Sequence, residues 1–258
     1  MSTERIAIII PWYNKIVYAK KTLDSIRAQT SKEWHCVIHD DASSDGVRDF
    51  LIKELNGDPR FTLILSNGPR GIIQGFHRCM AIAHQLGIDI VGMMDCDDAL
   101  HPTAVDEVLK FYAQPPYKEF VYTQFFFCDP NLVCTQGSGF SGAVLDGKSL
   151  LESGRVGHWK TFRLSAYERM TYPMSADYDF ASDREIGFRL EEVTRPWFLD
   201  KMLYYWRGWA EGSITQLQPL RAITSIHANN TGLDAIQRRK EWPSNWVELR
   251  DAALKSLS

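Results

Sequence analysis

The sequence predicts an α/β protein built on an open, mostly parallel sheet with helices on both sides. Short runs of β-branched and other apolar residues alternate with amphipathic stretches four times in the first half, which is the pattern of successive β-α units. The first run, Ile6–Ile10, is apolar throughout, as in a strand buried on both faces of a parallel sheet. With 258 residues, 45% of them apolar, the chain can bury a full core without disulfide or metal support.

The elements of the first half follow from apolar periodicity. Strands are expected at Ile6–Ile10, Cys36–His39, Phe61–Leu65 and Ile90–Met94. Four helices are expected between and after them, from apolar positions at helical spacing: Ala19, Leu23 and Ile26; Val47, Phe50, Leu51 and Leu55; Ile73, Phe76, Met80 and Ala83; and Ala104, Val105, Val108, Leu109 and Tyr112.

The second half of the chain is less regular. Glu119–Phe127 predicts a fifth strand, and Gly137–Gly147 is a glycine-rich loop region. Ile186, Leu190 and Val193 predict a helix that begins near Ser182, and Ala235–Leu257 predicts terminal helices interrupted at Pro243.

Charge and cysteine content exclude several classes of function. The 32 acidic and 29 basic residues leave a net charge of -3, which provides no basic field for a nucleic-acid backbone. The five cysteines contain no C-x-x-C pair, so neither a disulfide framework nor a zinc site is indicated. The apolar run that ends at Pro11 is too short for a signal peptide or a membrane span, so we expect a cytoplasmic protein.

Polar residues gather where each of the first four strands ends. These segments are Pro11–Asn14, Asp40–Gly46, Asn67–Gly71 and Asp95–Asp98. Ligands of open α/β sheets bind outside the carboxyl ends of the strands, so all four segments are expected on one rim. Each segment alone could simply cap the helix that follows it, because Asp, Asn and Ser are preferred caps.

Capping does not explain three carboxylates within four residues. Asp95, Asp97 and Asp98 repel one another unless a cation lies between them, and oxygen ligands suit Mg²⁺ or Mn²⁺. Such ions commonly bind substrate phosphates through one or two carboxylates, so the pattern predicts a diphosphate ligand. The chain has neither a G-x-x-x-x-G-K-[ST] loop nor a G-x-G-x-x-G motif after its first strand, which argues against P-loop and dinucleotide chemistry.

Together these motifs resemble those of the family 2 glycosyltransferases. The resemblance rests on Pro11-x-Tyr13-Asn14, Asp40-Asp41-x-Ser43-x-Asp45-Gly46 and Asp95-x-Asp97-Asp98, and it covers about the first 110 residues. It implies the GT-A fold, a Rossmann-like open sheet flanked by helices, and inverting, metal-dependent transfer of a sugar from a nucleoside diphosphate to an acceptor hydroxyl. It also implies a glycosyltransferase domain over residues 1–218, divided into a donor half (1–112) and an acceptor half (113–218), with a C-terminal helical extension over 219–258.

The resemblance further assigns roles on the donor side. Pro11, Tyr13 and Asn14 belong to the nucleotide site, and Asp41 faces the base. Asp97 and Asp98 take the ribose and the metal-diphosphate, with Asp98 and Asp97 as the metal ligands. Arg78 best fits the family arginine near the nucleotide, with Arg70 second. A carboxylate such as Asp41 can accept the N3–H of uracil or the donors of guanine, and uracil is favoured.

An inverting displacement also needs a base within reach of the attacking hydroxyl. The second half offers Asp177, Asp179, Asp183 and Glu185 before its helix, and the family Glu-Asp pair aligns with Ser182-Asp183. Asp183 is therefore the expected base, with Asp179 second. The structural alternative is a capping box at Ser182-x-x-Glu185, in which Asp183 only complements the helix dipole.

Three further residues have open assignments. His158 and Trp159 lie where relatives place the acceptor-side wall, although an isolated His or Trp is more often packing. Arg207 follows an aromatic segment that resembles the late arginine segment of the family, so it contacts either the diphosphate or a surface carboxylate.

The C-terminal part of the sequence bears on how many sugars are transferred and where. The Q-x-x-R-W signature of processive members is absent, so one sugar is transferred per encounter, in the synthesis of a surface polysaccharide or glycolipid. The basic-aromatic segment Gln237–Trp242 either contacts a membrane carrying a lipid-linked acceptor or is a solvated helix end. Two other functions stay open: a nucleotidyltransferase that makes sugar nucleotides, and a non-catalytic nucleotide-sugar binding protein.

Overall fold

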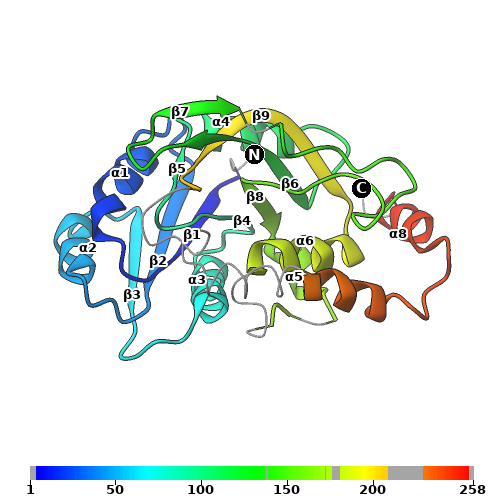
Figure 1. The fold of residues 1–258 in the computed structure, drawn as a ribbon, viewed down its shortest axis with the longest axis horizontal. Coiled ribbons are helices and arrows are strands. Elements are labelled where there is room, and N and C mark those ends of the chain that lie inside the picture. Colours follow the sequence, from blue (N-terminus) through cyan, green and yellow to red (C-terminus); the bar gives the residue numbers. More distant parts are fainter. Residues whose placement is uncertain (1–3, 138, 172, 176–180, 209–228, 256–258) are drawn as a thin grey trace.

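The structure is a computed structural model that describes residues 4–255 except 138, 172, 176–180 and 209–228 (Figure 1). Strands and helices alternate through the first half in the predicted order. They are β1 (Ile6–Trp12), α1 (Ile16–Arg27), β2 (Trp34–Asp40), α2 (Val47–Leu55), β3 (Phe61–Leu65), α3 (Ile72–Gln85), β4 (Ile90–Met93), β5 (Ala99–Leu100) and α4 (Ala104–Tyr112).

The four predicted strands form the parallel half of the sheet, in the order β3-β2-β1-β4. The prediction is confirmed for each strand, with β1 running two residues further because Pro11 and Trp12 still pair with His39 and Asp40. Every residue of β1 and β2 is buried, as continuous apolar runs indicate. Because the four strands are parallel neighbours, the loops that follow them meet at one edge.

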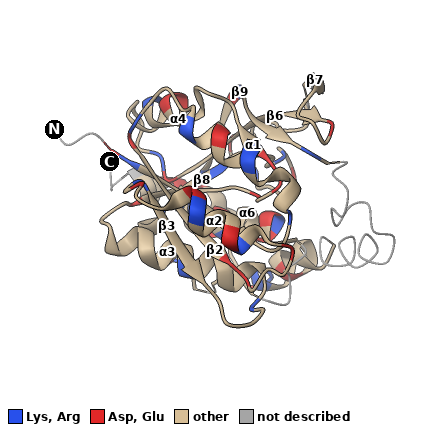
Figure 2. Ribbon diagram, turned by 90° about the vertical axis from the view of Figure 1, so that its left-hand side faces the viewer, with Lys and Arg blue, Asp and Glu red and all other residues tan. Residues whose placement is uncertain are grey.

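Two hydrophobic cores, one on each face, hold helices against the sheet. Alternate side chains of β1 (Ile8, Ile10) pack with α1, α2 and α4, whereas Ala7 and Ile9 pack with α3. Strand side chains alternate between the two faces, so one strand contributes to both cores. Figure 2 shows the resulting layers, with charged residues of both signs interspersed along the helices.

The second half extends the same sheet with strands of both directions. Its elements are β6 (Phe120–Cys128), β7 (Cys134–Gly137), β8 (Lys160–Arg163), α5 (Leu164–Glu168), α6 (Ser182–Val193) and β9 (Pro196–Trp206). The predicted fifth strand and the helix at Ser182 are confirmed. Strand β8 is antiparallel to both β4 and β6, and β9 pairs with β6 and β5. Figure 1 shows β6 and β9 curling over one end of the sheet.

Sequence analysis missed β5, β7, β8 and β9. The sequence of β8 is Lys-Thr-Phe-Arg, and all four residues are buried. Because most of its side chains are polar, it has no apolar run that would predict a strand. Strand β5 has two residues, too few for a period. The aromatic residues at the end of β9 form the segment that resembles the late arginine segment of the family, and they do not alternate with polar residues as a strand signal would require.

The C-terminal helices dock against α6. Residues 229–238 are helical, and α8 spans Trp246–Lys255, so the predicted interruption at Pro243 is confirmed. Arg238 pairs with Glu192 at 2.7 Å, and Arg239 pairs with Glu191 at 3.0 Å while its guanidinium lies 4.8 Å from the ring centre of Trp246.

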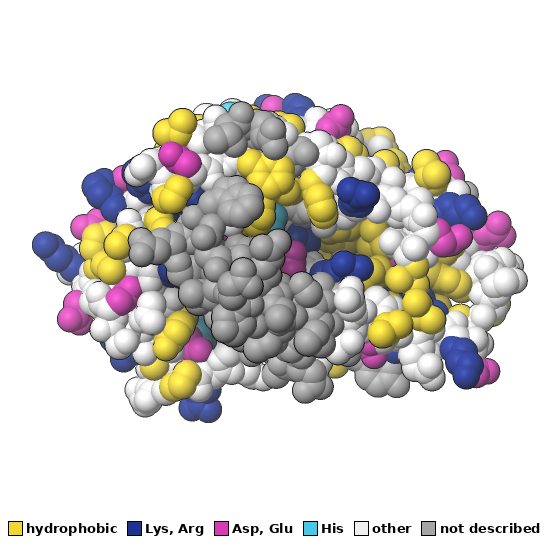
Figure 3. Space-filling model, viewed as in Figure 1, with side chains coloured by type: hydrophobic (Ala, Val, Ile, Leu, Met, Phe, Trp, Pro, Cys, Tyr) yellow, Lys and Arg dark blue, Asp and Glu magenta, His cyan; other side chains and the backbone are white. Residues whose placement is uncertain are grey.

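These contacts show that part of the basic-aromatic segment packs on the protein. Its two arginines are 11% and 5% exposed and bind carboxylates of α6, whereas Lys240 and Glu241 are exposed. Figure 3 shows acidic and basic side chains interspersed over the end of the molecule where α8 lies. None of the helices that the structure describes is both long and apolar enough to cross a bilayer.

Candidate functional site

The loop after β1 is tied to the loop after β2 by reciprocal hydrogen bonds. The backbone N–H of Asn14 donates to Ser43 Oγ at 2.8 Å, and Asn14 Oδ1 accepts the N–H of Ser44 at 2.9 Å. Asp45 Oδ2 accepts the N–H of Ile16 at 2.7 Å, so it satisfies the first turn of α1 from the neighbouring loop. Asp45 Oδ1 also accepts the N–H of Val47 at 3.1 Å, so Asp45 caps α2 and links the two loops as well. Asn14 and Asp45 preorganise the rim.

Asp41 ties the loop after β2 to the loop after β3. Its carboxylate accepts the N–H of Arg70 at 2.8 and 3.0 Å and that of Gly71 at 2.9 Å, immediately before α3. Asp41 is 7% exposed. The side chain predicted to face the base therefore also holds the segment that carries Arg70, whose own side chain is exposed.

Arg78 belongs to a polar group behind Asp41. Its Nη1 donates to Ser66 Oγ at 3.4 Å, and His39 Nε2 lies 2.9 Å from the same hydroxyl. Burial lowers the pKa of His39, the nearby Asp41 partly opposes this, and the imidazole is neutral at pH 7. The structure thus brings Arg70, Arg78 and Asp41 to one end of the rim, as predicted.

Pro11 and Tyr13 occupy the middle of the rim. Gly75 of α3 lies against Pro11, where an added Cβ would come within 2.8 Å of the proline Cβ. The helix can therefore approach the end of β1 closely. The Tyr13 side chain is 55% exposed, which leaves its ring available to a ligand.

Asp98 occupies a different environment from the one predicted for a metal ligand. It is 2% exposed, its Oδ2 accepts the Tyr204 hydroxyl at 2.8 Å, and its Oδ1 accepts the backbone N–H of Arg207 at 2.7 Å. Burial, with the neighbouring Asp97 and Asp95 charges, raises its pKa well above the usual range. Both oxygens are engaged in joining the acidic loop to β9, so the prediction for Asp98 is corrected to a supporting role.

Arg207 also differs from both of its predicted roles. It is 1% exposed, its Nε donates to the carbonyl of Pro130 at 3.1 Å, and its Nη1 donates to the carbonyl of Asp97. The guanidinium lies 5.0 Å from the ring centre of Tyr18. Arg207 is neither at the surface nor exposed to a diphosphate; it supports the acidic loop from beneath.

Asp95 and Asp97 are the carboxylates of the acidic loop that are not fully buried. Asp97 Oδ2 lies 3.5 Å from the ammonium of Lys15, which follows Asn14 in the first loop. Burial raises the pKa of Asp95 to about 7, with further contributions from Asp97 and Asp183. The cluster therefore carries unfavourable negative charge, one part of which Lys15 offsets.

The donor set of this loop fits a hard divalent cation. Among the described residues no group of three or more His, Cys, Asp or Glu side chains forms a ready-made metal site. Mg²⁺ and Mn²⁺ need fewer protein ligands when substrate phosphates and water complete the shell. Asp97, already beside the Lys15 cation, is placed to supply such a ligand.

Asp183 lies across from the acidic loop, at the start of α6. Its Oδ2 is 3.4 Å from Nζ of Lys160, which lies in β8 and is 2% exposed, while the Asp183 side chain is 54% exposed. Desolvation opposes ionisation of Asp183, but the charge and the hydrogen bond of Lys160 outweigh it and lower the pKa of Asp183. Asp183 also contributes electrostatically to the raised pKa of Asp95, so the start of α6 lies near the acidic loop.

The capping-box alternative at this helix is not formed. The N-cap of α6 is Ala181, with no side-chain capping bond. Glu185 instead accepts Arg189 Nε at 2.6 Å and the N–H of Ser175 at 3.1 Å. Asp179 and Asp177, the other carboxylates of this segment, lie outside the described residues.

His158 and Trp159 point to different surroundings. The imidazole of His158 stacks on Tyr204 with ring centres 4.8 Å apart, and burial together with Lys160 lowers its pKa to about 3. Trp159 is fully buried over Gly92, where an added Cβ would lie 2.3 Å from the indole. Trp159 is therefore a core residue, which corrects its prediction as acceptor wall. His158 remains beside the Lys160–Asp183 pair.

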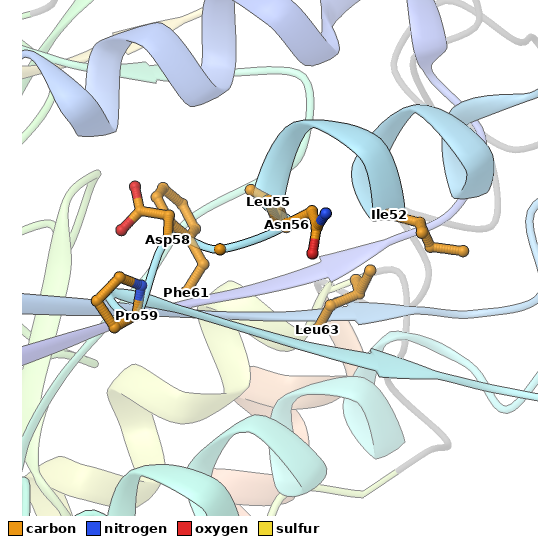
Figure 4. Close-up of a pocket in the computed structure, with 8 residues that line it drawn as sticks. Ile52, Leu55, Asn56, Asp58, Pro59, Phe61 and Leu63 are labelled. Carbon is orange, nitrogen blue, oxygen red and sulfur yellow. The ribbon is translucent and has the colours of Figure 1, made fainter.

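A separate surface hollow lies away from this rim. It is lined by α2, the following loop and β3, with Ile52, Leu55, Pro59, Phe61 and Leu63 among its residues (Figure 4). The α2–β3 loop joins the amino end of β3, opposite the end that carries the polar loops. The hollow has few charged groups and takes no part in the site.

Lys15 was not predicted as a site residue, although it directly follows the Pro11–Asn14 motif. Lys160 and Tyr204 lie in segments that the sequence does single out, beside His158 and before Arg207. Their contacts with Asp183 and Asp98 could not be predicted, because these contacts depend on the pairing of β8 and β9.

Comparisons with known proteins agree with this geometry. The profile of glycosyl transferase family 2 matches residues 7–171. The chondroitin synthase and the hyaluronan synthase of Pasteurella multocida are each 25% identical over 201 residues, which is 77% of this chain but 20% of each relative. The teichuronic acid biosynthesis glycosyltransferase TuaG of Bacillus subtilis, a putative assignment by its name, is 26% identical over 41% of both chains.

Solved structures share the fold. S. aureus TarS superimposes with a TM-score of 0.64 at 15% identity, over 92% of this chain and 44% of that one. A shorter TarS chain in complex with UDP gives 0.63 at 15% identity, over 91% and 71% of the two chains. The mannosyltransferase PcManGT of Pyrobaculum calidifontis, with GDP-Man and Mn²⁺, gives 0.51 at 16% identity over 98% and 81%. The expected GT-A fold is confirmed, and the chain belongs to glycosyl transferase family 2.

Proposed function

We propose that this protein transfers one sugar from a UDP-sugar to an acceptor hydroxyl, with inversion, during synthesis of a surface polysaccharide or glycolipid. The observation that carries the proposal is that Asp95 of the acidic loop lies within electrostatic reach of the Lys160–Asp183 pair. Displacement of a diphosphate by a hydroxyl needs two parts. One is a loop that holds the diphosphate, and the other is an ionised carboxylate that acts on the acceptor. Relatives named for chondroitin, hyaluronan and teichuronic acid synthesis support the substrate class.

The donor base lies, in this proposal, at the Asp41 end of the rim with Arg70 and Arg78. A carboxylate has about four lone-pair positions, and three N–H contacts leave room for one more donor. The N3–H of uracil is such a donor. The UDP complex of TarS favours uracil, whereas the GDP-Man complex of the mannosyltransferase keeps guanine as the alternative.

Asp97 would hold the metal, Mn²⁺ or Mg²⁺, together with phosphate oxygens and water. A divalent ion there neutralises negative charge on the diphosphate as it leaves. This chain's own contribution is to fix Asp97, through the bond from Arg207 to its carbonyl and the anchoring of the adjacent Asp98 on Tyr204. Lys15 adds a positive charge on the same side.

Asp183 is the proposed base. It accepts the proton of the acceptor hydroxyl as that oxygen attacks the anomeric carbon and the bond to the diphosphate breaks. Lys160 keeps Asp183 ionised, and ionisation is the condition for accepting a proton. His158 lies beside this pair and would contact the acceptor.

The acceptor is a sugar or a lipid-linked sugar, and the proposed place of reaction is the cytoplasm or the inner face of the membrane. One sugar is added per encounter. The two alternative functions, sugar-nucleotide synthesis and non-catalytic binding, would use the donor side without Asp183.

Product analysis tests the proposal. The protein is incubated with UDP-sugars or GDP-sugars, Mn²⁺ and candidate saccharide acceptors, and the released phosphates are identified. Free UDP with a glycosylated acceptor is expected. Release of pyrophosphate from UTP and a sugar phosphate would identify a nucleotidyltransferase, and binding without any product would identify a binding protein.

The base is tested with Asp183→Asn, Asp179→Asn and Asp177→Asn compared side by side. Asp183→Asn keeps the size of the side chain but cannot take a proton, so turnover should fall by about 10²–10⁴-fold with little change in donor affinity. A near-normal rate for Asp183→Asn beside a collapsed rate for one of the other two variants would transfer the role to that residue.

A further inference from the structure

Two cysteines face each other across the β6–β7 hairpin. Cys128 ends β6, Cys134 begins β7, and the two are partners in the ladder. Their sulfur atoms are 3.1 Å apart. Cys128 is buried at 1% exposure, whereas Cys134 is exposed, so one sulfur of the pair is open to solvent.

The turn between the cysteines is held by its own hydrogen bonds. Asp129 Oδ1 accepts the N–H groups of Asn131 and Val133, both at 2.8 Å. The N–H of Asp129 donates to the carbonyl of Val133 at 3.0 Å. This network keeps the two sulfurs together before any bond forms, so closing a disulfide requires little further ordering of the chain.

The same turn supports the acidic loop. The carbonyl of Pro130 accepts Arg207 Nε at 3.1 Å, and Arg207 binds the carbonyl of Asp97 and, through its backbone N–H, the carboxylate of Asp98. On the other side Lys21 of α1 donates to the carbonyl of Asn131 at 2.8 Å. The hairpin tip is therefore part of the scaffold under Asp97 and Asp98.

We propose that Cys128 and Cys134 form a reversible disulfide that braces this scaffold. The oxidant is a low-molecular-weight disulfide of the glutathione type. The Cys134 thiolate attacks one sulfur of the oxidant and releases a thiol. Cys128 then loses its proton and attacks the Cys134 sulfur, which releases the second thiol. Two protein thiols are oxidised and one external disulfide is reduced.

The other three cysteines do not share these features. Cys36 and Cys79 are fully buried, each at 0% exposure. Cys96, in the acidic loop, is half-buried and lies outside the strands, so it faces no cysteine across a ladder. The β6–β7 hairpin combines an exposed cysteine with a second cysteine that faces it.

Peptide mapping tests the bond. The folded protein is treated with oxidised glutathione, free thiols are alkylated, and the peptides are analysed by mass spectrometry. We expect a Cys128–Cys134 link that dithiothreitol reverses, absent in Cys134→Ser and retained in Cys96→Ser. A stable glutathione adduct on Cys134 with Cys128 still alkylated, or no reaction at either cysteine, would overturn the proposal.

Hydrogen exchange tests the bracing without any donor or acceptor. Oxidation should slow amide exchange in the peptides containing Asp98 and Arg207, and oxidised Cys134→Ser should show no such change. The melting temperature should rise by about 2–8 °C on oxidation. Protection confined to residues 128–137 would show that the bond forms but does not brace the acidic loop, and that part of the proposal would fail.

Discussion

The ammonium of Lys160 lies 3.4 Å from the carboxylate of Asp183, and 2% of the lysine side chain is exposed. Lys160 reaches this position because β8 is inserted antiparallel between β4 and β6, with Lys160 paired to Met93 of β4. The pair therefore joins the end of the parallel half of the sheet to the first turn of α6. The Lys160 ammonium lowers the pKa of Asp183 and partly offsets the rise in the pKa of Asp95.

Replacing Lys160 should change the pH dependence of turnover. In the native protein Lys160 lowers the pKa of Asp183, so a base at this position stays ionised to lower pH. Without the ammonium the pKa rises, and activity is lost at a higher pH as the solution is acidified. We expect Lys160→Met to shift the acidic limb of kcat/KM upward, with a larger loss of rate at pH 6 than at pH 8.

Lys118 provides the control for this prediction. It is also 2% exposed, but its ammonium donates to the carbonyls of Gln114 and Pro116, not to a carboxylate. Lys118→Met should lower stability without moving the acidic limb. Identical pH profiles for the Lys160→Met and native proteins would contradict the role of the pair.

Adjacent carboxylates in the acidic loop should respond differently to removal. Asp97→Ala loses one partly exposed ion pair, so its stability should change by less than about 1 kcal/mol. It should, however, abolish the metal-dependent stabilisation by UDP in thermal-shift measurements.

Asp98→Ala should lower stability but leave the metal-dependent stabilisation by UDP in place. It leaves the buried Tyr204 hydroxyl without an acceptor, although that oxygen still accepts the N–H of Asp95, and it leaves the Arg207 N–H without a partner. Together these losses cost about 2–5 kcal/mol. A stable Asp98→Ala protein that has lost its response to Mn²⁺ would return Asp98 to the metal site.

Asp41 should affect both stability and nucleotide affinity. Asp41→Ala frees the N–H groups of Arg70 and Gly71, at a cost of about 1–3 kcal/mol, and removes the acceptor proposed for the base. Asp58→Ala is the matched control, because Asp58 also accepts a backbone N–H, that of Arg60, but lies at the amino end of β3, away from the rim. Denaturant unfolding and UDP titration should show destabilisation in both variants but weaker UDP binding in Asp41→Ala alone. Equal UDP affinity in the two variants would show that Asp41 only supports the loop and does not contact the base.

The packing of Trp159 under Gly92 should not tolerate a methyl group. An added Cβ would lie 2.3 Å from the indole, and neither the strand nor the buried ring has space to move. Gly92→Ala should therefore lower the free energy of unfolding by about 1–3 kcal/mol or more. Gly68→Ala, where nothing lies within 4 Å, should change it by less than about 0.5 kcal/mol. A native-like denaturation midpoint for Gly92→Ala would mean that Trp159 can leave the core.

The local pattern of the sequence determined the parallel half of the fold and the rim that carries the site. The apolar run Ile6–Ile10 identifies a buried strand by itself, because a strand covered on both faces favours apolar side chains. Parallel order then requires the segments that contain Asn14, Asp41 and Asp97 to share an edge, whatever the rest of the chain does. These inferences depend only on the arrangement of apolar residues over short segments and on the direction of the strands.

The tertiary structure alone decided what each carboxylate does. Asp97 and Asp98 are neighbours of the same chemical type, and no sequence pattern separates them. Asp98 is buried because Tyr204, 106 residues away, meets it through the pairing of β5 with β9, whereas Asp97 turns toward Lys15. Lys160 likewise acquires its place beside Asp183 from the insertion of β8. Burial and charge at a site depend on partners distant in the chain. Pairing over such distances produces no local repeat of apolar residues from which it could be predicted.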